Sequence, residues 1–218
     1  IDCNLSWQMK NFDKKYLTNG KKYLAGTDEA GRGPLAGPVI AAAVILPQDF
    51  YDGRINDSKK LSASLREELF KVICKNAVSY AYASISHTKI DKINILNASL
   101  LAMKKSLEKL KIQPEIILVD GNKTFSYDAE VIPIVKGDAK SLSIASASII
   151  AKVIRDRIMI KLAKEYPNYG WDRNKGYPTK EHITAILEYG ICSIHRKTFL
   201  NKIYERANQT EFSFNDVV

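Results

Sequence analysis

The chain has 218 residues, of which 45% are hydrophobic and 26% charged, a composition typical of a globular protein rather than a disordered one. Its 33 Lys and Arg residues outnumber its 24 Asp and Glu residues, and the resulting net charge of +9 favours a polyanionic partner such as nucleic acid. Cys3, Cys74 and Cys192 form no C-x-x-C pair, which argues against a disulfide framework or a zinc site. Since no apolar run approaches the ~20 residues that span a bilayer, we expect no membrane partner and a cytoplasmic location.

The first part of the chain predicts a helix over residues 5–17 and buried strands over 23–27 and 39–46. Asp28 and Glu29 directly follow the first of these strands. Carboxylates at a strand end suit a hard divalent cation such as Mg²⁺, which takes oxygen ligands and can hold a phosphate. On local evidence alone, a solvated turn is the competing interpretation.

A glycine-rich segment comes next, and Gly31-Arg32-Gly33 offers bare backbone N–H groups and a forked cation that match phosphate oxygens. A dinucleotide-binding fingerprint does not fit, because the glycines read G-x-G-x-x-x-G up to Gly37. Pro34 and Pro38 would also interrupt the helix that such a loop must open.

The middle of the chain continues with alternating helices and strands. Ser64 and Glu67 form a capping box that predicts a helix ending near Lys75, and residues 80–85 alternate as a third strand. Apolar residues then recur at steps of four and three, which predicts a helix whose apolar face packs in the core. These residues are Leu96, Leu100, Met103, Leu107 and Leu110.

A second carboxylate pattern follows that helix. The apolar strand over residues 115–119 delivers Asp120, and a strand over 131–135 leads into Asp138. A long, Ser- and Ala-rich helix is predicted over about 139–164, which places Asp138 at a helix N-terminus, where the helix dipole favours an anion. A plain N-cap is the alternative role for Asp138.

The last part of the chain mixes aromatic and cationic residues from Trp171 to His182, with a helix from about Thr179 and a basic tail. We therefore predict an α/β fold with a mixed β-sheet flanked by helices. The expected division is one domain over 1–200, with a small helical C-terminal region from about 171, and a tail over 201–218.

Four carboxylates thus stand at ends of secondary structure: Asp28, Glu29, Asp120 and Asp138. In a layered sheet such ends can converge, and the clustered charges would repel and raise one another's pKa. Divalent cations offset that cost, and a converged acidic set with one or two metals is the apparatus of two-metal phosphodiester hydrolysis.

These motifs, in this order and spacing, resemble ribonuclease HII, the type 2 ribonuclease H family of bacterial type, over nearly the whole chain. The matching segments are Asp28-Glu29-Ala30-Gly31-Arg32-Gly33-Pro34, Asp57-Ser58-Lys59-Lys60-Leu61-Ser62, Asn94-Ile95-Leu96, Val119-Asp120-Gly121-Asn122, Lys136-Gly137-Asp138, Ala151-Lys152-Val153 with Arg155-Asp156, Lys175-Gly176-Tyr177-Pro178-Thr179 and His195-Arg196.

The resemblance implies a ribonuclease H-like fold in which the four carboxylates bind Mn²⁺ or Mg²⁺, with two ions when substrate is bound. It implies an endoribonuclease that acts on RNA/DNA hybrids and on duplex DNA with embedded ribonucleotides. Cleavage on the 5′ side of a ribonucleotide would leave 3′-hydroxyl and 5′-phosphate ends, in a role of ribonucleotide removal from DNA. We expect the protein to act as a monomer.

The resemblance also implies substrate-binding residues. Gly31, Arg32 and Gly33 would read the 2′-hydroxyl through their backbone, and Tyr177 would pack on the next sugar, although a rim-packing tyrosine is the alternative. Lys59, Lys60 and Arg196 would meet phosphates. His182 and His195 are expected to be phosphate contacts or packing residues rather than general acids.

Three further expectations remain to be weighed. The related HIII type has a similar acidic set but carries lysine in place of Arg32 and has an N-terminal platform domain. Only about 22 residues precede the first predicted strand here, so we expect the HII type.

A second possible function is a non-catalytic basic module that binds hybrids by their shape. Residues Gln209 to Phe214 resemble a sliding-clamp-binding peptide, the alternative being a tail without a partner.

Overall fold

The computed structural model describes residues 3–201 and 203, and its centre is a five-stranded mixed sheet in the order β3-β2-β1-β4-β5. The strands are β1 (Leu24–Ala30), β2 (Val39–Ile45), β3 (Ser79–Ile85), β4 (Ile116–Asp120) and β5 (Glu130–Ile134). The helices are α1 (Cys3–Lys14), α2 (Ala63–Asn76), α3 (His87–Ile93), α4 (Ile95–Glu108), η1 (Gly137–Ala139), α5 (Leu142–Glu165), η2 (Pro167–Tyr169), α6 (Trp171–Asn174) and α7 (Lys180–Tyr189).

Strand direction decides which side chains share an edge of the sheet. The central strand β1 pairs antiparallel with β2 and parallel with β4, while β5 pairs parallel with β4. Because Thr27 is opposite Val119, the next residues along the two strands, Asp28 and Asp120, lie side by side near the same edge. The predicted α/β fold with a mixed sheet is confirmed.

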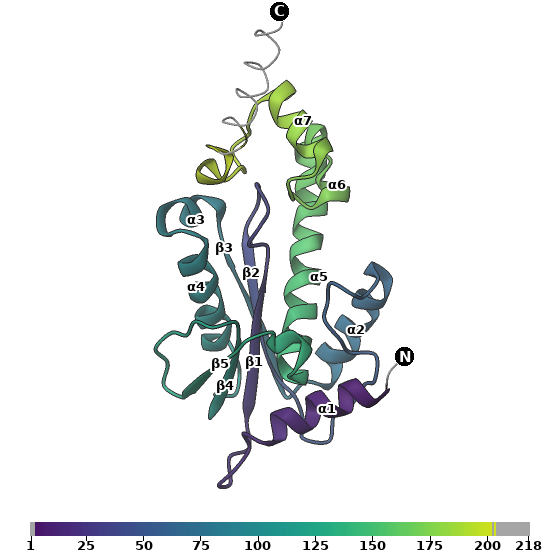
Figure 1. Ribbon diagram of the computed structural model, residues 1–218, viewed down its shortest axis with the longest axis vertical. Helices are drawn as coiled ribbons and strands as arrows, with labels where there is room; N and C mark the ends of the chain where they lie inside the picture. The colour runs from purple at the N-terminus through teal and green to yellow at the C-terminus, as the bar shows by residue number, and fades with distance from the viewer. Residues whose placement is uncertain (1–2, 202, 204–218) are drawn as a thin grey trace, which may run out of the picture.

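Helices cover both faces of the sheet, with α5, α1 and α2 on one side and α3 and α4 on the other (Figure 1). Every residue of β2 is buried, which explains its unbroken apolar sequence. Helix α5 touches β1 at Gly26, where an added Cβ would lie 2.2 Å from the backbone of Ser143. A glycine on the strand and small residues on the helix therefore allow backbone to approach backbone.

The C-terminal part packs on the far half of α5, which runs past the end of the sheet toward α6 and α7 (Figure 1). A separate apolar cluster holds this part together around the fully buried Trp171, with Met159 from α5 and Leu35 and Ala36 from the loop after β1. Helix α5 and the loop after β1 thus join the sheet to the C-terminal helices.

The predicted elements are present, with differences at some of their ends and one additional helix. Strand β1 continues through Asp28 and Glu29 to Ala30, because those residues still pair with β2. Helix α2 is capped by Ser62, whose hydroxyl accepts from the Leu65 N–H, so the Ser64 capping box is wrong. Helix α3 was not expected, since its seven residues are too few to show a period.

The start of α5 also differs from the prediction. Ser141 is the N-cap of this helix and accepts from the Ile144 N–H, so Asp138 is neither its cap nor part of its first turn. Asp138 lies instead in the short 3₁₀ turn η1, which the left-handed Lys136 introduces.

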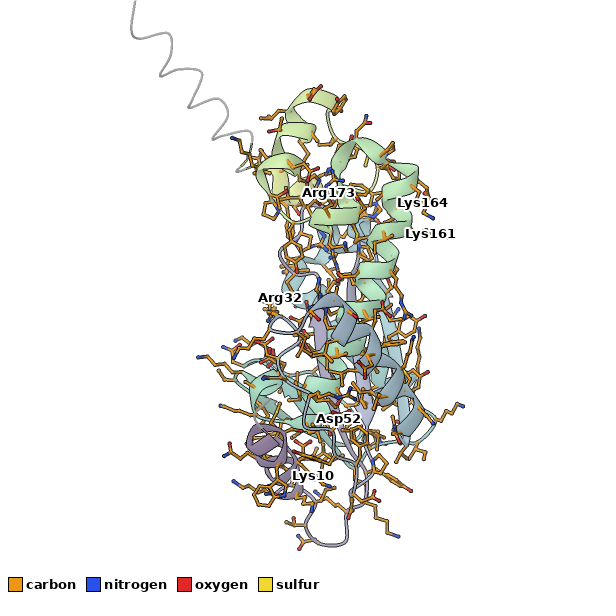
Figure 2. The ribbon with its side chains drawn as sticks, turned by 90° about the vertical axis from the view of Figure 1, so that its right-hand side faces the viewer. Lys10, Arg32, Asp52, Lys161, Lys164 and Arg173 are labelled. Atoms are coloured by element: carbon orange, nitrogen blue, oxygen red, sulfur yellow. The ribbon has the colours of Figure 1, made fainter. Side chains whose placement is uncertain are left out.

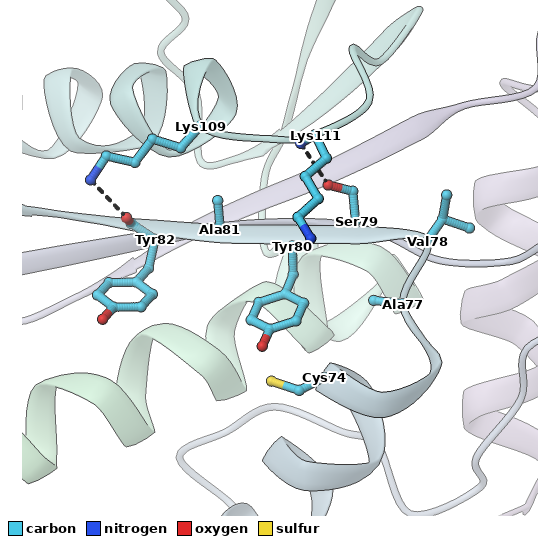
Figure 3. A pocket seen from close by; sticks show the side chains of 9 residues that line it. All are labelled: Cys74, Ala77, Val78, Ser79, Tyr80, Ala81, Tyr82, Lys109 and Lys111. Carbon is cyan, nitrogen blue, oxygen red and sulfur yellow. Dashed lines mark hydrogen bonds between the residues drawn. The ribbon is translucent and has the colours of Figure 1, made fainter.

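The edge strand β3 borders a cavity of about 580 Å³, lined by residues of α2, β3 and the end of α4. Figure 3 shows the rings of Tyr80 and Tyr82 next to each other, and the Lys109 amine donates to the Tyr82 carbonyl at 3.3 Å. None of the four predicted catalytic carboxylates lines this cavity. None of the helices in the described part of the chain contains an apolar stretch of the length that spans a bilayer.

Candidate active site

The structure brings the four predicted carboxylates together from three segments of the chain. Asp28 and Glu29 come from β1, Asp120 from the end of adjacent β4, and Asp138 from the turn before α5. Asp28 is only 5% exposed and Asp138 9%. Strand alternation directs Asp28 and Glu29 to opposite faces of β1, yet the charge of Asp120 acts on both carboxylates.

Close backbone packing fixes the turn that carries Asp138. The Gly137 N–H donates to Asp120 Oδ1 at 2.6 Å, and an added Cβ at Gly137 would lie 2.6 Å from Ile144. A side chain at this position would therefore push the turn away from α5. The glycine places Asp138 next to Asp120 without any direct bond between the two carboxylates.

Each carboxylate has a local partner, either a hydrogen-bond donor or a nearby cation. Asp28 Oδ1 accepts from the Glu29 N–H at 2.6 Å, and Glu29 faces Arg32 at 3.5 Å. The amine of Lys59 lies 3.7 Å from Asp138 Oδ2. These partners neutralise part of the negative charge that the group concentrates.

The charge that remains, together with burial, shifts the pKa values of the residues in this group. Burial, followed by the charges of Glu29 and Asp120, raises the pKa of Asp28 well above its usual range. Burial also raises the pKa of Glu29 and of Asp138, although Arg32 opposes the shift at Glu29. Burial lowers the pKa of Lys59, but Asp138 and Asp28 outweigh it and the net shift is upward. The folded chain therefore holds several carboxylates in a place where ionisation is costly.

This arrangement fits a divalent cation by the chemistry of its donors. All the available ligands are carboxylate oxygens, which Mg²⁺ and Mn²⁺ prefer, and a cation would relieve the repulsion that raises these pKa values. No three His, Cys, Asp or Glu side chains within residues 3–201 are arranged to hold a metal ion as they stand. The carboxylates would have to turn toward a common ion from their present partners, among them Arg32, Lys59 and the backbone N–H groups of Glu29 and Gly137.

The predicted ribose-reading residues lie beside this group and beside each other. Gly33 is exposed, and an added Cβ there would lie 3.7 Å from Cε1 of Tyr177, whose side chain is 38% exposed. The Leu35 N–H donates to the Gly176 carbonyl at 2.8 Å, which joins the loop after β1 to the loop before α7. Figure 2 shows Arg32 projecting where the sheet meets the C-terminal helices.

Arg196 lies behind the glycine loop rather than on the surface. It has no exposed area, and its guanidinium donates to the carbonyls of Gly31 at 2.7 Å, Arg32 at 3.0 Å and Gly37 at 2.9 Å. Burial lowers its pKa to about 9, which leaves it charged at neutral pH. This placement differs from the predicted phosphate contact, because each of the three guanidinium nitrogens already donates to the loop and the side chain is buried.

Arg155 of α5 has a similar position, and the sequence alone predicts no role for it beyond its place in a family motif. This fully buried side chain donates to Pro38 at 3.1 Å and Ala36 at 3.2 Å on one loop, and to Lys175 at 3.0 Å on the other. Its guanidinium lies 5.7 Å from the ring centre of Tyr177. Arg155 therefore connects the two loops that carry Gly31–Gly33 and Tyr177.

The predicted lysines stand on an exposed loop at the rim. Lys59 and Lys60 are both exposed, and Asp57 orders their loop by accepting from the Lys59 N–H at 2.9 Å. The loop is tied to α5 by the hydroxyls of Ser58 and Ser148, 3.0 Å apart. His182 and His195, in contrast, are fully buried in the C-terminal part and cannot meet a phosphate as the chain is folded.

Comparison with known proteins agrees with this geometry. The family model described as Ribonuclease HII matches residues 25–202. A curated relative named Ribonuclease HII, from Caldanaerobacter subterraneus subsp. tengcongensis, is 53% identical over 196 residues, which cover 90% of this chain and 81% of the relative.

Solved structures show the same fold. The ribonuclease H2 of Pyrococcus horikoshii OT3 superposes with a TM-score of 0.68 at 30% identity, covering 84% of this chain and 98% of that one. The RNase HII of Archaeoglobus fulgidus, solved in a complex with PCNA, gives a TM-score of 0.63 at 28% identity, covering 80% of this chain and 93% of that one.

Proposed function

The chain belongs to the ribonuclease HII family and is a ribonuclease H, and from this premise we propose the bond that it cuts. The proposed reaction is hydrolysis of the phosphodiester on the 5′ side of a ribonucleotide, in RNA/DNA hybrids and in DNA with embedded ribonucleotides, leaving 3′-hydroxyl and 5′-phosphate ends. The observation that carries this proposal is the meeting of four carboxylates with a glycine loop and an exposed tyrosine at one edge of the sheet.

Asp28, Glu29, Asp120 and Asp138 would hold Mg²⁺ or Mn²⁺, two ions when substrate is present. Bound there, the metal would supply Lewis-acid activation of water and stabilise the charge on the leaving 3′-oxygen. Asp28 is the best candidate to contact both ions, because the charges of Glu29 and Asp120 both raise its pKa. Lys59, next to Asp138, would attract the substrate phosphate.

The loop after β1 and Tyr177 would select the ribonucleotide. A 2′-hydroxyl is the group that distinguishes ribose from deoxyribose, and backbone groups of Gly31, Arg32 and Gly33 can bond it whatever the base. The Tyr177 ring beside Gly33 would pack on the following sugar, where a flat face without a hydroxyl fits best. Arg196 and Arg155 hold the loops and place two positive charges behind them, toward the expected phosphates.

The test is cleavage of a DNA duplex with one embedded ribonucleotide by the wild type and by Asp120→Asn. We expect the substitution to lower the rate by roughly 1,000-fold or more, because it removes a metal-binding charge. Asp128→Asn is the matched control, since it makes the same charge change at an exposed position in the β4–β5 connection. Equal rates for Asp120→Asn and wild type would instead favour the non-catalytic binding module.

We also propose that the protein removes ribonucleotides from DNA as a monomer and reaches DNA through a sliding clamp. The archaeal RNase HII noted above was solved with PCNA. The clamp-like segment, Gln209 to Phe214, lies outside the described residues. A peptide of residues 207–218 should bind a bacterial clamp at tens of micromolar, and a peptide with both phenylalanines changed to alanine should not.

A further inference from the structure

Two buried histidines connect the C-terminal core to the backbone of Tyr177. His182 of α7 and His195 lie with their Nε2 atoms 3.2 Å apart, and neither side chain is exposed by more than 1%. His182 Nδ1 lies 3.0 Å from the Tyr177 carbonyl, while His195 Nδ1 lies 3.0 Å from the Cys192 N–H. The pair thus forms one hydrogen-bonded chain that ends at Tyr177.

Neighbouring donors fix which nitrogen of each ring carries the proton. The Trp171 indole N–H can only donate, and it points at His182 Nε2 at 3.0 Å, so that nitrogen must accept. The proton of neutral His182 is therefore on Nδ1, where it is donated to Tyr177. The Cys192 N–H likewise makes His195 Nδ1 an acceptor, which puts the His195 proton on Nε2. That proton faces His182 Nε2, whose one lone pair is then shared by the His195 and Trp171 donors.

The two assignments are independent and agree with each other. A protonated ring at either position would bring N–H donors face to face inside the core, so the chain of bonds requires both histidines to be neutral. Burial, followed at His195 by the neighbouring histidine, lowers the pKa of both residues, that of His195 to about 4. The direction of every bond is therefore set at neutral pH.

We propose that His182 is a positioning residue. It holds Tyr177 in place for recognition of the junction between a ribonucleotide and the deoxyribonucleotide that follows it, an inference that rests on the proposed function. The Tyr177 N–H donates to the Asn174 carbonyl at 2.9 Å, and its carbonyl accepts from Thr179 as well as His182. With the backbone held at both ends, the ring stays between Gly33 and Arg155. His195 and Trp171 act on Tyr177 through His182, since they select the tautomer that donates.

Replacing His182 with asparagine or with glutamine distinguishes this positioning role from a merely structural one. In His182→Asn the side-chain amide can occupy the place of Nδ1 and donate to the Tyr177 carbonyl. In His182→Gln the amide reaches the place of Nε2, and the Tyr177 carbonyl loses its side-chain donor and keeps only the Thr179 N–H. Both variants are polar and close in size. We expect His182→Gln to lose about tenfold in the ratio of cleavage at a single ribonucleotide in DNA to cleavage of a continuous RNA strand in a hybrid. His182→Asn should keep the wild-type ratio.

The ratio is informative because a general loss of folding lowers both rates together. In a Tyr177→Ala background, His182→Gln should change the ratio no further, which is the result of a double-mutant cycle for two coupled residues. A wild-type ratio in His182→Gln, or an equal loss in both backgrounds, would overturn the inference. A wild type that cuts no ribonucleotide would instead refute the proposed function.

A second measurement needs no variant. In wild-type protein with ¹⁵N-labelled histidine, the nitrogen shifts should show His182 protonated on Nδ1 and His195 protonated on Nε2 at neutral pH. A His182 protonated on Nε2 could not accept from Trp171, and that result would also overturn the inference.

Discussion

Gly31 and Arg155 are packed so closely that a methyl group at Gly31 would lie 2.1 Å from Nε of Arg155. Gly31 also has a φ of +101°, which other residues rarely adopt. The backbone of the glycine loop is therefore pressed directly onto the guanidinium that connects it to the loop of Tyr177.

Gly31→Ala should consequently damage both folding and cleavage. We expect it to lower the free energy of unfolding by about 3 kcal/mol, from the strained φ and the displaced arginine together. Gly20→Ala is the control, because Gly20 has a φ of +80° but nothing within 4 Å of an added Cβ. Urea denaturation should show a loss of only about 1 kcal/mol there, and equal losses at both sites would exclude the contact with Arg155 as a cause.

Asp28→Asn should abolish cleavage and make the protein more stable. The folded chain raises the pKa of Asp28, so this group stabilises the fold fully below its unfolded pKa and loses that contribution as pH rises through the folded value. Removing the charge should add about 1 kcal/mol at pH 7 without metal. Asp128→Asn should change neither property in the same denaturation and cleavage assays.

Arg196→Lys keeps the positive charge but cannot reproduce three guanidinium bonds to Gly31, Arg32 and Gly37. We expect a loss of about 3 kcal/mol in stability, together with weaker discrimination between duplexes with and without a ribonucleotide. The matched control is Arg173→Lys, an exposed arginine in the same part of the molecule. Discrimination unchanged from wild type in a folded Arg196→Lys protein would contradict the role of Arg196 in holding the loop.

The stability of the protein should also depend on Asp13 of α1. Its carboxylate accepts from the Ser143 N–H at 2.9 Å in the first turn of α5, and burial raises its pKa to about 6. A raised pKa gives a contribution that is present below about 4, the usual value, and is lost as pH rises through 6.

Asp13→Asn keeps an acceptor without the charge, so its stability relative to wild type should increase between pH 4 and pH 6, by up to about 3 kcal/mol. The comparison with wild type at each pH matters because His195, facing His182, His87 and Cys192, changes stability in the opposite direction over a similar range. A constant difference between the two proteins from pH 4 to pH 7 would mean that Asp13 has an ordinary pKa when folded.

Much of the fold could be predicted because its elements carry strong local patterns. The apolar runs of β1, β2 and β4 are flanked by breaks, and the step of four and three residues marks α4. The beginning of α5 was harder, because Asp138 and Ser141 are both good capping residues and only the packing of Gly137 on Ile144 decides between them.

The carboxylates of the candidate site could be proposed from their positions at strand ends, since strand direction determines where those ends meet. Arg196 could not be placed in this way. An arginine is ordinarily exposed, and its burial here depends on carbonyls from residues 31–37, more than 150 positions away in the chain. No local pattern around Arg196 predicts that these carbonyls lie beside it.

Helix α5 has a mechanical consequence. Ser148 touches the loop of Lys59 and supports Asp28, and Arg155 stands seven residues later, which is two turns along the same face of the helix. Two turns measure about 11 Å, so helix α5 sets the distance between the carboxylates that would bind the metal and the loops that would recognise the sugar. One residue inserted between Ser148 and Arg155 would rotate these two side chains by about 100° relative to each other, so that they could no longer contact their two partners at once.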